Sequence, residues 1–160
     1  MVIDANTGLK LQKAMLKSAD LLIENGLSDW KLKLNNKRTA LAETYYGSKT
    51  IMFSKHFVLV ADEDQFIGVT LHEVTHALLG RGHGHNREFK KLCTEISPNA
   101  DYAVRSVDVP IRKYLLECPK CGYKGSTNVN KERYCGMCWK NDKEAVFFTK
   151  KENVLEVKMW

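Results

Sequence analysis

The sequence of 160 residues predicts an α+β fold in which helices pack on a small antiparallel sheet and a small cysteine-bearing module follows. Three observations predict it. Several segments place apolar residues at helical spacing, residues 30–53 alternate apolar and polar residues between turns, and two Cys-x-x-Cys pairs lie in the last third of the chain. We expect a first domain over residues 1–110 and the module over residues 111–160.

The first helix is expected over residues 7–25, where apolar residues recur at helical spacing before the stop signal Asn25-Gly26. Strands are then expected over residues 30–34, 40–46 and 50–53. The first of them alternates apolar and basic side chains, and polar or glycine-containing turns separate the three. We interpret these strands as an antiparallel meander.

A second helix is expected after the acidic run of residues 62–64, whose carboxylates suit the positive end of a helix dipole. Its predicted buried stripe consists of Ile67, Leu71, Val74 and Leu78. Asn86 is a typical cap for a third helix, which Ser97-Pro98 would close. Its predicted inner face consists of Phe89, Leu92, Cys93 and Ile96. The module is expected to begin around Val109-Pro110 and to end with strands over residues 146–149 and 154–160.

The second predicted helix contains an H-E-x-x-H sequence, His72-Glu73-Val74-Thr75-His76. Residues four apart lie on one face of a helix, so the imidazoles of His72 and His76 can bind one tetrahedral zinc ion. Glu73 would be the general base that takes a proton from water activated by the metal. This pattern indicates a zinc-dependent hydrolase.

A third ligand must come from beyond the helix, and the candidates are His83 and His85. The metzincin spacing would place it at Gly82, which excludes that subclass. We favour His85, because it directly precedes Asn86 and the start of a helix. His83 is the alternative ligand, or else a donor to the reacting oxyanion or a solvated loop residue.

The H-E-x-x-H helix, the glycine-rich turn over residues 80–84 and the run Gly84-His85-Asn86-Arg87-Glu88-Phe89 resemble the SprT-like (Spartan-type) metalloproteases. The resemblance covers roughly residues 1–140, although the glycine turn is shorter than in eukaryotic members. It implies a zincin-like protease domain, with zinc on His72, His76 and His85 and with Glu73 as the base. It also implies a DNA-stimulated cleavage of proteins attached to DNA.

The two Cys-x-x-Cys pairs, Cys118/Cys121 and Cys135/Cys138, predict a second zinc ion held by four thiolates in a zinc ribbon. A closed site of this kind is structural, and it supplies much of the folding free energy of a small module. Cys93 is interpreted as a buried apolar residue. The odd cysteine count favours metal binding in a reducing compartment over disulfides.

The formal net charge is +6 and lies mostly in residues 111–160. Four thiolates and a zinc ion would remove much of this asymmetry, which leaves a mildly basic protein compatible with a polyanionic partner. Basic and aromatic residues interleave in the ribbon as they do in proteins that bind single-stranded DNA. The alternative is that these aromatic side chains fill the core of the ribbon.

The sequence therefore predicts a zinc metalloprotease that acts on protein substrates near DNA. A nucleic-acid-binding or adaptor protein with a structural or weakly active zinc site is the alternative, although a structural site has no use for Glu73. A zinc hydrolase of non-peptide amides is a third option. We expect a monomer in the cytoplasm, since no signal peptide is evident and no apolar run approaches the ~20 residues of a membrane span.

Overall fold

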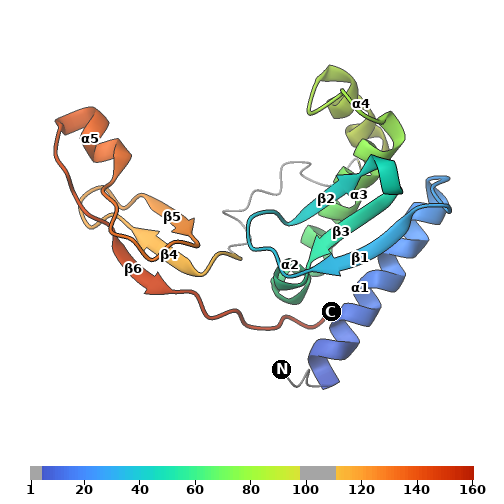
Figure 1. Cartoon of the computed structure of the whole chain (residues 1–160), viewed down its shortest axis with the longest axis horizontal. Coiled ribbons are helices and arrows are strands. Elements are labelled where there is room, and N and C mark those ends of the chain that lie inside the picture. Colours follow the sequence, from blue (N-terminus) through green and yellow to red (C-terminus); the bar gives the residue numbers. More distant parts are fainter. Residues whose placement is uncertain (1–4, 98–110) are drawn as a thin grey trace.

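The computed structural model describes residues 5–97 and 111–160, and it shows two small sheets with helices packed mainly on the first (Figure 1). This is the α+β fold that the sequence predicts. The expected start of the module at Val109-Pro110 lies outside the described residues, as does Pro98. Among the described residues, no helix has both the length and the apolar composition that crossing a membrane requires.

Helix α1 spans Ala5–Glu24 and buries one face of the chain at four-residue spacing, through Lys10, Ala14, Ser18 and Leu22. It ends where the sequence predicts, because Gly26 adopts a positive φ of 73° and the amide of Leu27 donates to the carbonyl of Leu22 at 2.8 Å.

The first sheet is mixed, and the prediction of an antiparallel meander is wrong. Its strands are β1 (Lys31–Asn35), β2 (Ala42–Tyr45) and β3 (Thr50–Ser54), in the order β1-β3-β2. Strand β3 pairs with β2 in antiparallel fashion and with β1 in parallel fashion. The most apolar strand takes the centre, since Ile51 and Phe53 are fully buried.

The connection between β1 and β2 explains this order. It passes over the end of β3, where the Ser54 hydroxyl donates to the carbonyl of Lys37 at 2.6 Å and the Ser54 amide donates to the carbonyl of Leu41 at 2.9 Å. The chain can therefore reach the far edge of β3 instead of turning back beside β1. Strand β2 is therefore an edge strand, and it lies next to the helix that contains the H-E-x-x-H sequence.

Helix α2 (Lys55–Val60), which the sequence reading missed, begins at Ser54 and leads directly into helix α3 (Glu63–Leu79). Asp62 and Gln65 form a capping box at the start of α3. Two residues of the predicted stripe of α3, Leu71 and Val74, are buried, but Leu78 is 40% exposed. Phe66 and Val69, which the prediction left out, are buried. His72 and His76 are partly exposed and lie at the border of this buried face.

Helix α4 (Arg87–Ile96) packs on α3 and is capped by the Asn86 side chain, as predicted. Its buried side chains are Phe89 and Cys93. The aromatic centre of the first domain is Phe66, whose ring lies 5.4 Å from that of Phe53 and 6.1 Å from that of Phe57.

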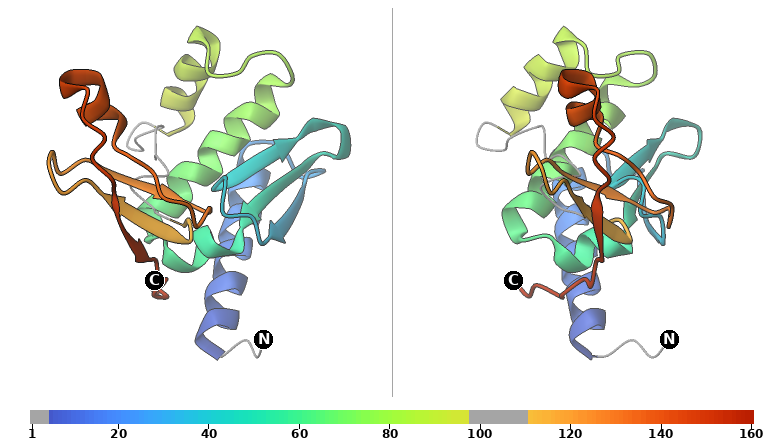
Figure 2. Two further views of the ribbon diagram at one scale, coloured as in Figure 1. Left: turned by 60° about the vertical axis from the view of Figure 1, so that its left-hand side comes forward. Right: turned by 90° about the vertical axis from the view of Figure 1, so that its left-hand side faces the viewer.

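The module holds an antiparallel sheet in the order β5-β4-β6 and a short helix α5 (Gly136–Asp142). The strands are β4 (Tyr114–Glu117), β5 (Lys124–Thr127) and β6 (Thr149–Glu152). The final strand predicted over residues 154–160 is absent. That tail instead returns to the first domain, where the Lys158 amide donates to the carbonyl of Leu59 at 2.9 Å (Figures 1 and 2).

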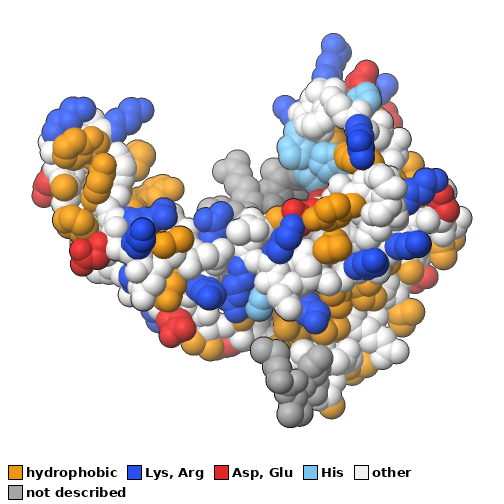
Figure 3. Space-filling view, in the orientation of Figure 1, with side chains coloured by type: hydrophobic (Ala, Val, Ile, Leu, Met, Phe, Trp, Pro, Cys, Tyr) orange, Lys and Arg blue, Asp and Glu red, His pale blue; other side chains and the backbone are white. Residues whose placement is uncertain are grey.

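Figure 1 shows the two sheets at opposite ends of the molecule, joined along the base by the C-terminal tail. The space-filling view shows a hollow between them, with histidine side chains facing it from the first domain and basic side chains on both of its sides (Figure 3).

Candidate active site and zinc ribbon

Three imidazoles converge where α3 meets the turn that follows it. His85 Nε2 lies 3.0 Å from His72 Nε2 and 3.2 Å from His76 Nε2. In a tetrahedral site with zinc–nitrogen distances of about 2.0–2.1 Å, ligand nitrogens are about 3.3 Å apart. The three nitrogens therefore suit a single zinc ion, and the donor set leaves one position open.

The backbone of the turn and one aromatic side chain hold His85 in place. Gly80, Gly82 and Gly84 all adopt positive φ angles, so the chain can reverse within a few residues after α3. Phe89, which is 1% exposed, packs against all three histidine rings with centroid distances of 4.4–4.8 Å. The sequence placed Phe89 on an inner helix face but did not show this contact with the histidines.

His83, the alternative third ligand, points elsewhere. Its Nδ1 lies 2.7 Å from Glu88 Oε2 on the first turn of α4. The structure thus brings His85, and not His83, together with the two histidines of the helix.

The electrostatic surroundings of the histidines suit metal ligation. Burial, together with the neighbouring His72 and His85, lowers the pKa of His76 to about 4. The imidazole is therefore neutral at pH 7 and offers a lone pair, as a metal ligand must.

Glu73 lies beside this cluster with only 7% of its surface exposed. Thr44 of β2 donates a hydrogen bond of 2.7 Å to its Oε2. Burial raises the pKa of Glu73 to about 7, and the hydrogen bond from Thr44 opposes that rise. A carboxyl group with such a pKa is suited to accept and return a proton near neutral pH.

A groove of about 550 Å³ lies between the end of β2 and the glycine turn, and it is lined by Thr44, whose hydroxyl contacts Glu73. Tyr46 lies on its wall, and the pKa of this phenol is raised by burial and by the charge of Glu73. Arg81 lies across the groove, over the backbone of Gly47. No local sequence pattern indicates this groove, because its walls come from two segments, residues 44–48 and 81–82. Its lining consists of Thr44, Tyr45, Tyr46, Gly47, Ser48, Arg81 and Gly82.

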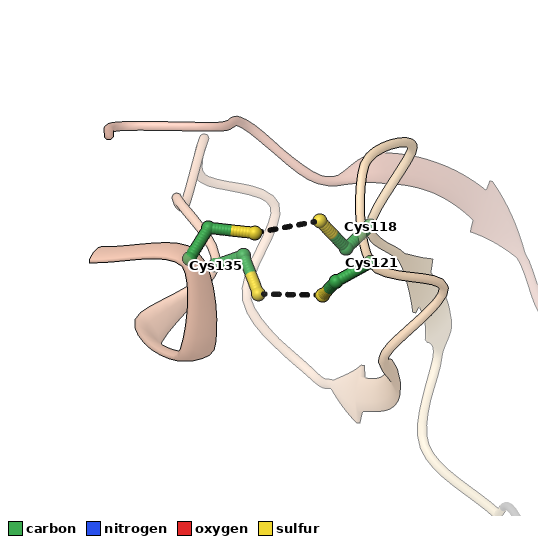
Figure 4. Close-up of side chains that lie close together, drawn as sticks. Cys118, Cys121 and Cys135 are labelled. Carbon is green, nitrogen blue, oxygen red and sulfur yellow. Dashed lines mark hydrogen bonds between the residues drawn. The ribbon is translucent and has the colours of Figure 1, made fainter. Parts of the chain in front are cut away.

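The four cysteines of the two Cys-x-x-Cys pairs form the second cluster. Cys118 Sγ lies 3.6 Å from Cys138 Sγ, and Cys121 Sγ lies 3.6 Å from Cys135 Sγ (Figure 4). Zinc–sulfur bonds of about 2.3 Å place tetrahedral sulfurs about 3.8 Å apart, so the four thiols fit one closed zinc site. Cys93 is buried in α4, away from this cluster.

Cys118, Cys135 and Cys138 form the core of the module, with Val146 and Phe148 packed against them, whereas Cys121 is exposed. Four of its aromatic side chains are instead about half exposed: Tyr123 (51%), Tyr134 (49%), Trp139 (46%) and Phe147 (56%). They do not fill the core of the ribbon, which was the alternative to a role in binding. The rings of Tyr134 and Trp139 lie 5.7 Å apart.

Fold and clusters together define an α+β protein with a three-histidine site suited to zinc and, beyond it, a four-cysteine module. Residues 12–112 match the family model described as SprT-like family. The chain belongs to the SprT-like family, as its motifs suggest.

Curated relatives agree with this assignment. The chain is 31% identical to a protein of Oceanobacillus iheyensis named "Protein SprT-like", over 68% of this chain and 77% of the relative. It is 35% identical to the "Protein SprT-like" of Lactococcus lactis, over 49% of this chain and 57% of the relative.

A solved structure, the metallopeptidase zymogen jannalysin of Methanocaldococcus jannaschii, is similar over 49% of this chain and 75% of its own, with 20% identity and a TM-score of 0.42. A likeness at that level carries no detail of activity over to this chain.

Proposed function

We propose that this protein is a zinc metallopeptidase in which His72, His76 and His85 hold the metal and Glu73 is the general base. The observation that carries the proposal is the convergence of three imidazole nitrogens beside a buried carboxylate. Zinc bound there would polarise a substrate carbonyl and lower the pKa of a water molecule. Glu73 would accept the proton of the attacking water and return it to the leaving amine.

The substrate chain would lie in the groove beside Glu73. The groove begins at the end of the edge strand β2, whose outer side pairs with no strand among the described residues. An extended peptide can add to such an edge through main-chain hydrogen bonds. The catalytic unit would comprise residues 1–110 and the ribbon residues 111–160, with a structural zinc on Cys118, Cys121, Cys135 and Cys138.

We propose further that the substrates are proteins associated with DNA. Support comes from the net charge of +6 and from the half-exposed aromatic side chains of the module. A depression of about 520 Å³ on the second sheet is also lined by Lys124, Lys150 and Lys151. Aromatic faces next to lysines suit unpaired bases and their phosphates. None of the five cysteines forms a disulfide, which fits the cytoplasmic location we propose.

The alternative function is that of a nucleic-acid-binding adaptor whose histidine site has little turnover. Both the peptidase and the adaptor would bind DNA through the surface of the ribbon, so a measurement of DNA binding alone would not distinguish these two functions. The burial of Glu73 favours the enzyme, because burying a carboxyl group is costly and a structural metal site does not need one. Hydrolysis of a non-peptide amide would use the same residues on a different substrate.

The test is cleavage of a basic DNA-binding protein with and without single-stranded DNA, for the wild type and Glu73→Gln. Glu73→Gln keeps the size of the side chain but cannot accept a proton, so cleavage should fall by about 10²–10⁴-fold. Metal analysis should find two zinc ions per chain in both proteins. Removal of zinc by a chelator should abolish cleavage, and added zinc should restore it.

Equal cleavage by the wild type and Glu73→Gln would contradict the assigned base. Absence of cleavage by the wild type, with both zinc ions bound and DNA present, would favour the adaptor function. Cleavage that DNA does not stimulate would support the peptidase and contradict the proposed setting.

A further inference from the structure

The hydroxyl group of Thr44 contacts the carboxylate of Glu73, the proposed general base. Among the described residues, its hydroxyl makes the one side-chain hydrogen bond to the carboxylate of Glu73. Oγ1 of Thr44 lies 2.7 Å from Oε2 of Glu73 and 3.2 Å from the main-chain oxygen of the same residue. One hydroxyl therefore contacts both the side chain and the backbone of Glu73.

The position of this hydroxyl is fixed by the sheet. Thr44 pairs with Ile51 of the central strand β3, and Ile51 is fully buried. Glu73 in turn is fixed by its place in α3, which packs on β2. A glutamate side chain has three rotatable bonds, so its carboxylate would take several orientations without a contact at its end. The short hydrogen bond from a rigid strand selects one of them.

A hydroxyl group also suits both protonation states of a general base. It has one proton to donate and lone pairs with which to accept. It can donate to the ionised carboxylate, and it can accept from the protonated acid while donating to the main-chain oxygen of Glu73. The contact can thus persist while the carboxylate gains and loses a proton.

We propose that Thr44 is a positioning residue that holds the carboxylate of Glu73 in the orientation needed for proton transfer. This inference rests on the proposed peptidase function. The competing explanation is that Thr44 only ties β2 to α3 and affects stability alone.

The test compares Thr44→Val, which keeps the shape and removes the hydroxyl, with Thr44→Ser, which keeps the hydroxyl. Thr44→Val should lower kcat by about 10- to 100-fold, a part of what a general base contributes, with KM changed less than about twofold. Bound zinc should remain at the wild-type level. Thr44→Ser should retain kcat within about threefold of the wild type.

Thr70→Val is the matched control. Thr70 is a fully buried threonine of the same helix α3, and its hydroxyl contacts Ser18 and the carbonyl of Phe66 but not Glu73. This variant should lower the thermal unfolding temperature and leave kcat unchanged. If the two variants are equally stable and kcat falls only in Thr44→Val, the loss is due to the missing contact between Thr44 and the carboxylate of Glu73.

A wild-type kcat in folded Thr44→Val would overturn the inference, and so would a Thr44→Ser variant as slow as Thr44→Val. If the wild type itself cleaves nothing, the proposed function fails first. Crystal structures of zinc-bound wild type and Thr44→Val then decide, because an unchanged orientation of the Glu73 carboxylate would overturn the positioning role. A reorientation of that carboxylate in Thr44→Val would support it.

Discussion

The ammonium group of Lys10 lies 4.2 Å from the ring centroid of Trp160, although 150 residues separate the two in the sequence. Both side chains donate to the carbonyl of Ala61, Lys10 at 3.0 Å and Trp160 at 3.2 Å. The Trp160 ring also lies 5.6 Å from that of Phe66 in α3. The tail that leaves the ribbon thus packs at the base of the helix that carries the histidines.

Substitution of Trp160 should destabilise the first domain. Trp160→Ala removes an aromatic contact, a cation–π contact and a hydrogen bond, and because the indole is only partly buried we expect a loss of about 2–3 kcal/mol in the free energy of unfolding. Trp160→Phe keeps a ring on Phe66 and should lose about 1 kcal/mol. Urea unfolding followed by circular dichroism measures both. Equal stability of Trp160→Ala and the wild type would show that the tail does not hold this contact in solution.

Lys10 should make stability depend on pH in the alkaline range. Burial lowers the pKa of Lys10 from 10.5 to about 8, although the carboxylates of Asp62 and Glu63 oppose this shift. Between these two pH values the unfolded chain keeps a proton that the folded chain has released. The folded state therefore gains stability relative to the unfolded state as pH rises from about 8 to 10.5.

Comparison with Lys10→Met isolates this effect from the other groups that titrate. The difference in unfolding free energy between wild type and Lys10→Met should shift in favour of the wild type by on the order of 1–3 kcal/mol from pH 7 to pH 10. The measurement is urea unfolding at each pH. A difference that stays constant over this range would mean that Lys10 remains charged in the folded protein.

The elements that local patterns determine were predicted well. Helix α1 follows from apolar residues at helical spacing and the stop at Asn25-Gly26, although its buried positions include Lys10 and Ser18. Helix α4 follows from its Asn86 cap. The candidate metal ligands also follow from local spacing. Histidines four residues apart lie on one face of a helix, and the two cysteines of a Cys-x-x-Cys turn can bind one metal ion. The sequence favoured His85 over His83 because of its place before Asn86, and the fold supplies the geometric reason: the turn directs the ring of His85 back to α3.

The pairing of strands and the path of the tail could not be read from local patterns. Strand β1 has the same alternation whether its partner is parallel or antiparallel, so its parallel pairing with β3 was missed. Residues 154–160 have a strand-like composition, yet Trp160 packs against Phe66 and Lys10 of the first domain instead of extending the second sheet. The contact of Thr44 with Glu73 likewise joins residues 29 positions apart.

The two histidines of the turn should differ sharply in metal binding. His85→Ala removes a nitrogen within 3.2 Å of both helix histidines, and the affinity of this site for zinc should fall by at least about 100-fold, more than the loss of an outer contact causes. His83→Ala breaks only the contact with Glu88 and should keep two zinc ions per chain. Metal analysis after dialysis against a weak chelator measures both. Loss of the metal in His83→Ala but not in His85→Ala would reverse the assignment.

The ribbon should depend on its own zinc ion. Cys135 is fully buried and lies 3.6 Å from Cys121, so Cys135→Ser replaces a thiolate with a poor ligand inside the core of the module. We expect one zinc ion per chain instead of two, and loss of amide protection from exchange in β4, β5 and β6. Cys93→Ala is the control, because Cys93 is buried in α4 and should leave both ions bound. Two tightly bound ions in Cys135→Ser would contradict the four-thiolate site.

Exposed aromatic side chains of the ribbon should contribute to DNA binding if unpaired bases stack on them. Trp139 and Tyr134 have rings 5.7 Å apart and are each about half exposed, so Trp139→Ala should not disturb the buried cysteine core. Trp139→Ala should weaken binding of single-stranded DNA by about 1–3 kcal/mol, since each stacked base contributes about that much. Affinity for duplex DNA, whose bases are already stacked, should change much less.

Fluorescence anisotropy with single-stranded and duplex DNA at one salt concentration measures both affinities. The control is Leu16→Ala, because Leu16 is an exposed apolar residue of α1. An equal loss of affinity for both kinds of DNA would place the contact on the phosphates, and no loss would remove Trp139 from the interface.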